Sequence, residues 1–126
     1  MNSKRELGNL GESLACDSLA RRGYAIVERG WRTPQGEVDI VARDGDCWVF
    51  VEVKARHGRG AGLPEEALTP AKLARLSELA EAFLAERAGD GSAVGETDWR
   101  IDLVAIELGR DDRVRRLTVL PALAPD

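Results

Sequence analysis

Several residue types that build common functional sites are scarce in this chain of 126 residues. It has one histidine, His57, which excludes a metal site with two histidines. The spacing of its two cysteines, Cys16 and Cys47, matches neither a zinc-binding nor a redox motif. We therefore expect both to be reduced thiols in a cytoplasmic protein. The sequence offers no support for a Ser/His/Asp or Cys/His nucleophile system.

Long apolar runs are also missing. No stretch approaches the roughly 18 apolar residues that a membrane-spanning helix needs, and residues 1–6 lack the apolar stretch of a signal peptide. We therefore predict a cytoplasmic protein that does not interact with a membrane. The composition, 44% hydrophobic and 32% charged, is typical of a globular protein. The length suits one domain, which we predict at residues 1–120, followed by a short tail at 121–126.

An excess of positive charge is absent too, because the net charge is −4. This balance argues weakly against a nucleic-acid partner, but the distribution of charge matters more than its sum. The segment 54–63 contains several basic residues and no acid. We expect basic residues in and near this segment to hold a phosphate backbone, namely Arg32, Arg56, His57, Arg59 and Lys72.

The apolar periodicity predicts the element order α-β-β-β-α-β-β. The predicted helices lie at 4–22 and 70–87, and the predicted strands at 24–28, 36–43, 47–55, 99–107 and 113–119, the last at a sheet edge. Thr69 and Pro70 suit the start of the second helix, and Asp44-Gly45 is typical of a hairpin. Loops are predicted at 29–35, 57–64 and 88–97. The order implies a sheet with helices packed on it.

Two neighbouring strands carry the most informative residues, Asp39 on one and Glu52 and Lys54 on the other. Glu52 and Lys54 point the same way because strand side chains alternate between faces. A hairpin would bring Asp39 beside them. Two close carboxylates suit Mg²⁺ or Mn²⁺, and a lysine beside them can hold a water, as metal-assisted phosphodiester hydrolysis requires. The alternative is an exposed strand aspartate with an ordinary amphipathic strand.

Glu12 is a further candidate, on the first predicted helix. Gly8, Gly11 and Ala15 surround it on one stripe of that helix. Small residues allow a helix to approach a sheet closely, which would bring Glu12 near the carboxylates. It could then support a metal or its bound water. The alternative is a solvated helix glutamate.

Glu37 and Lys72 have weaker signals. Glu37 shares a strand face with Asp39. It could assist the metal, but we favour the interpretation that it only lies at the strand entrance. Lys72 lies in the first turn of its helix, where the helix dipole does not favour a cation. This position hints at a phosphate contact, although an ordinary solvated lysine fits equally well.

Taken together, Asp39 and the run Glu52-Val53-Lys54 resemble the Asp…(Asp/Glu)-x-Lys signature of the restriction-endonuclease-like, or PD-(D/E)xK, nuclease superfamily. A longer set of motifs is similar to the YraN-like family of bacterial proteins, over residues 4–106. That set comprises Gly8-x-x-Gly11-Glu12, Gly23-Tyr24, Trp31-Arg32, residues 36–40, residues 50–54, Pro64, Lys72 and Arg100-Ile101-Asp102.

This resemblance implies an α/β fold with an α-β-β-β-α-β core, in which a mixed central sheet is flanked by helices. It also implies kinship with archaeal Holliday-junction resolvases. Carried over, the catalytic residues are Glu12, Asp39, Glu52 and Lys54. Asp39, Glu52 and the Val53 carbonyl are the implied ligands of Mg²⁺ or Mn²⁺. The chain departs from the superfamily pattern at Val38, where a proline is frequent.

The function we expect is that of a metal-dependent nuclease-like protein, which hydrolyses phosphodiester bonds in DNA, including branched or recombination intermediates. The alternative is a non-catalytic nucleic-acid-binding or adaptor protein in DNA processing. An RNA substrate stays open at this stage. A two-fold homodimer would suit a four-way junction, by analogy with the relatives.

Overall fold

A computed structural model describes residues 4–58, 64–87 and 98–121 of the chain. Its elements, in chain order, are α1 (Lys4–Arg21), β1 (Ala25–Thr33), β2 (Gly36–Asp44), β3 (Cys47–His57), the short 3₁₀ helix η1 (Pro64–Ala67), α2 (Pro70–Arg87), β4 (Trp99–Leu108) and β5 (Val114–Leu120). No helix within the described residues is long and apolar enough to cross a membrane.

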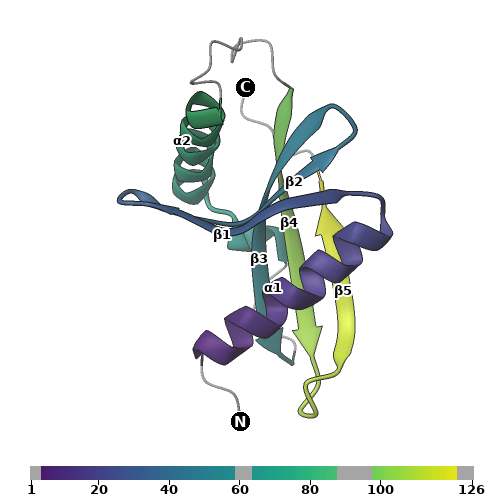
Figure 1. Ribbon diagram of the computed structural model, residues 1–126. Coiled ribbons are helices and arrows are strands. Elements are labelled where there is room, and N and C mark those ends of the chain that lie inside the picture. The colour runs from purple at the N-terminus through teal and green to yellow at the C-terminus, as the bar shows by residue number, and fades with distance from the viewer. Residues whose placement is uncertain (1–3, 59–63, 88–97, 122–126) are drawn as a thin grey trace.

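The five strands form one mixed sheet in the order β1-β2-β3-β4-β5. Only β3 and β4 pair in parallel, and the other neighbours are antiparallel. In Figure 1, α1 crosses in front of the sheet, whereas α2 lies beside the upper parts of β2 and β3. The prediction of a mixed α/β arrangement, with β3 central and β5 at an edge, is confirmed.

Each helix covers its own apolar layer. Ala15 and Leu19 of α1 pack with the side chains of one sheet face, among them Val49 and Ile106. On the other face, Phe83 of α2 is surrounded by aromatic rings, with centroid distances of 5.3 Å to Trp31, 5.4 Å to Trp48 and 5.7 Å to Phe50. Burial of apolar surface on both faces holds the helices to the sheet.

Local signals of the sequence set several element boundaries. The Lys72 backbone N–H donates to Thr69 Oγ1 at 3.2 Å, which confirms Thr69 as the N-cap of α2. The β2–β3 hairpin turns after Asp44, where Gly45 has φ 62°. Gly23 follows α1 with φ 93°, a conformation typical of the residue after a helix end.

The prediction of a loop over residues 29–35 is wrong. β1 continues to Thr33, with Trp31 opposite Val38 and Arg32 opposite Glu37. Only Pro34 and Gln35 separate it from β2. Gly30 and Pro34 misled the prediction, because both residues are typical of loops, whereas an edge strand has one free side and tolerates such residues. The predicted loop residues 59–63 and 88–97, Arg59 included, lie outside the described residues.

Candidate functional site

The candidate site lies where β2 and β3 separate. Their backbone pairing runs from Asp44 and Cys47 to Ile40 and Val51, and stops there. Beyond this point the Asp39 side chain takes the place of a backbone acceptor, because its Oδ2 accepts a hydrogen bond from the Val53 backbone N–H at 2.8 Å. The separation opens a gap in the sheet, and side chains from both of its faces can reach it.

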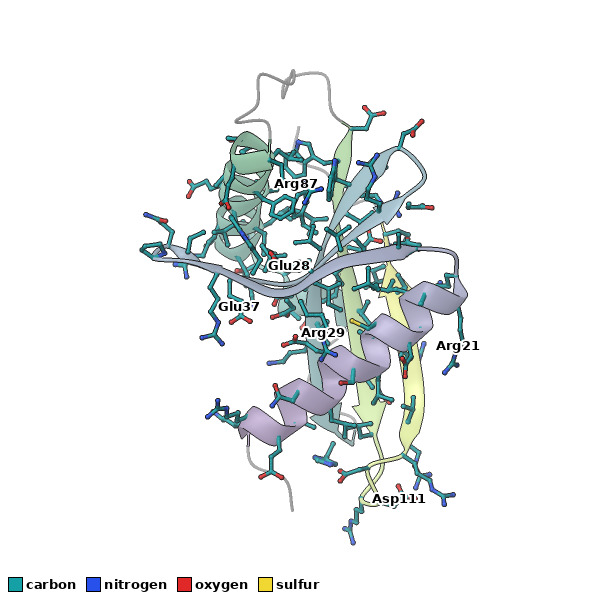
Figure 2. The ribbon with its side chains drawn as sticks, in the orientation of Figure 1. Arg21, Glu28, Arg29, Glu37, Arg87 and Asp111 are labelled. Carbon is teal, nitrogen blue, oxygen red and sulfur yellow. The ribbon has the colours of Figure 1, made fainter. Side chains whose placement is uncertain are left out.

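Four carboxylates gather at this gap. One carboxylate oxygen from each of Glu12, Glu37 and Asp39 lies within 4.8 Å of the others. Glu52 shares a hydrogen bond with Asp39. The site therefore draws on α1, β2 and β3. Figure 2 shows Glu37 on the side of the β1–β2 hairpin that faces α1.

Gly11 is what permits α1 to lie this close to β3. A Cβ atom at Gly11 would lie 2.8 Å from the Ala55 Cβ and 3.5 Å from Val53 Cγ1. Gly11 is buried, and its neighbour Glu12 is thereby brought to the edge of the gap. Gly8 was expected to contribute to the same close approach, but a Cβ there would meet nothing within 4 Å. Gly8 therefore has no such part in the packing.

The pKa values of two carboxyls are raised at the gap. Burial, the hydrogen bond with Glu52 and the negative charge of Glu52 raise the pKa of Asp39 to about 8, against a smaller lowering by the Val53 N–H. Burial and the charge of Glu37 raise the pKa of Glu12, while Arg29 and Arg32 act against this rise. The gap thus favours either a proton or a cation between its carboxylates.

Three cationic side chains neutralise part of this charge. Lys72 Nζ lies 2.9 Å from Glu52 Oε2, Arg32 Nε lies 3.3 Å from Glu37 Oε2, and Arg29 Nε lies 4.0 Å from Glu12 Oε1. A cavity of about 470 Å³ opens beside them, with Asp39, Glu52, Lys72 and Arg75 in its lining. Glu12, Glu37 and Glu52 thus each have a cationic side chain as a neighbour. The neighbour of Asp39 is Glu52, with which it shares a hydrogen bond.

Lys54 lies two residues beyond Glu52 on the same strand, and its side chain is exposed. Within residues 4–58, 64–87 and 98–121 it has neither a hydrogen bond nor an ion pair. Strand alternation places it on the face that carries Glu52. Lys54 is therefore an unpaired cation on the same strand face as Glu52, two residues along β3.

The other basic residues predicted for the site are scattered. Lys72 and Arg32 lie at the gap as ion-pair partners of its carboxylates. His57 lies at the end of β3, five residues beyond Glu52 or about 17 Å along the strand, and pairs with Asp112 at 2.6 Å. The structure therefore does not bring His57 to the carboxylates, and Arg56 lies between the two positions.

Glu37 lies at the strand entrance, as interpreted from sequence, because it is the second residue of β2. Its carboxylate also belongs to the cluster with Glu12 and Asp39, which the interpretation did not favour. The signal was present, since Glu37 and Asp39 alternate on one strand. What decided its place was the approach of α1, a tertiary contact that strand periodicity does not contain.

The donor set suits a hard divalent cation. Carboxylate oxygens surround the gap, the Val53 backbone lies beside it, and neither histidine nor cysteine is among its residues. Mg²⁺ and Mn²⁺ prefer such oxygen ligands. The raised pKa of Asp39 beside Glu52 marks a position where positive charge relieves repulsion between carboxylates.

Comparison with known proteins identifies the family. The model of the "Uncharacterised protein family UPF0102" matches residues 11–106. Among similar proteins, a UPF0102 protein of Roseiflexus castenholzii is 51% identical over 107 residues, covering 84% of this chain and 82% of the relative. One from Renibacterium salmoninarum is 45% identical over 119 residues, covering 93% and 97%. One from Mycolicibacterium vanbaalenii is 41% identical over 122 residues, covering 97% and 96%.

The chain therefore belongs to the UPF0102 family. This result confirms the YraN-like part of the resemblance found in the sequence. The match includes every residue that contributes a carboxylate to the gap, since Glu12, Glu37, Asp39 and Glu52 all lie between residues 11 and 106.

Proposed function

We propose that this protein is a metal-dependent nuclease of the restriction-endonuclease-like superfamily, which hydrolyses phosphodiester bonds in DNA. The observation that carries the proposal is the gap between β2 and β3. There Asp39 and Glu52 share a hydrogen bond beside Glu12, and the free Lys54 follows on the same strand. This combination supplies the ligands and the cation that metal-assisted hydrolysis needs.

Asp39, Glu52 and the Val53 carbonyl would hold Mg²⁺ or Mn²⁺. The hydrogen bond from the Val53 N–H orients the Asp39 carboxylate toward this position. The bound metal would supply Lewis acidity and lower the pKa of a water molecule. Glu12, whose carboxylate lies close to that of Asp39, would support the metal or orient its water through a hydrogen bond.

Lys54 would act on the substrate side of the site. Its ammonium group would hold the attacking water and offset negative charge on the phosphoryl oxygens in the transition state. A lysine held in an ion pair would be less free to do this, and Lys54 has none among the described residues. Lys72 is held by Glu52 instead and contributes to the electrostatic balance of the gap.

The charges around the gap support a substrate that contains phosphate groups. The N-terminus of α2 lies beside Glu52, since Lys72 belongs to its first turn. Helix N-termini attract phosphate groups, as do Lys54 and Arg32. We assign DNA as the substrate, with branched or recombination intermediates as the preferred form by kinship with Holliday-junction resolvases. A two-fold dimer would present two such sites to a four-way junction.

Two measurements test this function. Isothermal calorimetry with Mn²⁺ should show binding that is lost in Asp39→Asn, whereas an adaptor protein need not bind metal. Hydrolysis of labelled DNA in Mg²⁺ should fall by about 100-fold or more in Lys54→Ala, because general acid–base and electrostatic groups contribute on this order. A Lys54→Ala protein that cleaves at the wild-type rate would contradict the role assigned to Lys54.

A further inference from the structure

The sheet face that carries Glu52 continues beyond the candidate site. Lys54 of β3 pairs with Ala105 of β4, and Ala105 pairs with Thr118 of β5. Paired residues on neighbouring strands share a face, as do residues two apart along one strand. Lys54, Ala105 and Thr118 therefore form a row across three strands, next to Glu52.

A second row follows at the next position on this face. Arg56 pairs with Glu107, and Glu107 pairs with Arg116. Arg116 is exposed, and within the described parts of the chain its side chain has no hydrogen bond or ion pair. We call Lys54, Arg56, Thr118 and Arg116 the basic sheet surface. Its three cations face one acid, Glu107, on a protein whose net charge is −4.

Among the described elements, neither α1 nor α2 covers the basic sheet surface. The first turn of α2 contacts Glu52 through Lys72. Further along the helix, Phe83 packs on Phe50 and Trp48, so α2 runs away from Lys54 and Arg56. α1 packs on the opposite face. Figure 1 shows the lower parts of β3, β4 and β5 extending past the end of α2.

The surface ends in a hollow at the β4–β5 turn. A cavity of about 890 Å³ lies there, and its lining includes Glu107 and Arg116 of this face together with Arg110, Asp111 and Arg115. The lining thus contains three arginines and two acids. From Glu52 to Arg56 the strand advances four residues, or about 13 Å.

We propose that the basic sheet surface binds the phosphate backbone of a nucleic-acid strand that leaves the candidate site toward the β4–β5 edge. The inference rests on the proposed function for the identity of the ligand. It adds Arg116 and Thr118 of β5 as contacts that fix the register of the substrate. Phosphate contacts of this kind position a nucleic acid without reading its sequence.

The test measures binding of a fluorescent DNA duplex by anisotropy in EDTA, which prevents hydrolysis. Arg116→Glu should weaken binding by about tenfold or more, and Arg116→Ala should lower the slope of log K against log salt by about 0.9. Arg21→Glu is the matched control, because it makes the same charge change at an exposed residue at the end of α1, on the opposite side of the sheet (Figure 2). It should bind within about twofold of the wild type.

Several outcomes would overturn this inference. The first is equal DNA affinity of wild type and Arg116→Glu. The second is a loss of DNA affinity in Arg21→Glu as large as that in Arg116→Glu. The third is binding of an acidic polyglutamate peptide in place of DNA. The proposed function fails separately. A wild type that binds DNA through Arg116 but never cleaves it overturns the nuclease, whereas a wild type that cleaves DNA without help from Arg116 overturns the surface alone.

Discussion

At the scale of single residues, Asp39 lies in an electrostatic conflict. Burial and the neighbouring Glu52 raise its pKa to about 8, while its Oδ2 is fixed by the Val53 N–H. A carboxyl in this position holds a proton at neutral pH unless a cation replaces it. Metal binding by the wild type should therefore release protons near pH 7.

A pH prediction follows from this shift. The folded pKa of about 8 exceeds the unfolded value of 3.8, so Asp39 contributes most to stability below pH 3.8 and loses that contribution as the pH rises through 8. Asp39→Asn has no such titration. In EDTA, its free energy of unfolding relative to wild type should rise between pH 4 and 8 and then level off. Urea denaturation at each pH measures this, and a constant difference would contradict the shift.

Lys72 is expected to compete with a metal for Glu52, to which it lies 2.9 Å away. An exposed ion pair contributes up to about 1 kcal/mol, so Lys72→Gln should tighten Mn²⁺ binding by about fivefold. Arg75→Gln is the matched control, because Arg75 lines the same cavity without an ion pair among the described residues. Equal Mn²⁺ affinities of the two variants in calorimetry would contradict the claim that Lys72 competes with the metal for Glu52.

At the scale of elements, the contact between α1 and β3 decides where Glu12 lies. A Cβ at Gly11 would meet the Ala55 Cβ at 2.8 Å, whereas a Cβ at Gly8 would meet nothing. Gly11→Ala should lower the free energy of unfolding by about 1–3 kcal/mol through overpacking. Gly8→Ala should raise it by up to about 1 kcal/mol through helix propensity. Urea denaturation compares them, and similar values would contradict the close approach.

The elements differ in how well the sequence predicts them. β3 was found because its apolar run is nearly continuous. α2 was found because its apolar residues recur at helical spacing after a cap at Thr69. β1 was cut short because Gly30 and Pro34 are typical of loops, although Gly30 adopts φ 63° within the strand. β1 pairs with a strand on one side only and is mostly exposed, so its sequence contains few apolar residues in a strand pattern.

The candidate site was predictable only in part. The positions of Asp39 and Glu52 on adjacent strands follow from alternation and hairpin geometry. The contribution of Glu37 and the ion pair of Lys72 with Glu52 depend on how α1 and α2 approach the gap. Such tertiary contacts join residues far apart in the chain, and local patterns do not encode them.

At the scale of the whole molecule, a polar network ties distant strands together at the end away from the gap. Arg100 bonds Asp102 through Nε at 3.0 Å and reaches both Asp44, at 3.1 Å, and the Tyr24 hydroxyl, at 2.6 Å. Tyr24 also donates to Asp102, which is fully buried. The network joins β4 to the end of β2 and to the segment between α1 and β1.

Removing Arg100 should destabilise the molecule without altering the site. Loss of one partner of a buried ion pair costs about 3–5 kcal/mol, so Arg100→Ala should unfold at a clearly lower urea concentration. Arg110→Ala, at an exposed arginine, should stay within about 0.5 kcal/mol of wild type. Mn²⁺ affinity of folded Arg100→Ala should match wild type, and a lost affinity would show that the network also supports the gap.

The central claim is that the carboxylates at the gap hydrolyse phosphodiester bonds with a divalent metal. The most direct test is cleavage of labelled single-stranded, duplex, flap and four-way-junction DNA in Mg²⁺ or Mn²⁺, by wild type and Glu52→Gln in parallel. The account predicts metal-dependent cleavage of at least one of these substrates by the wild type and its loss in Glu52→Gln. Two results would contradict this account. One is a wild-type protein that binds both metals yet cleaves none of the four DNA substrates, and the other is equal cleavage by wild type and Glu52→Gln.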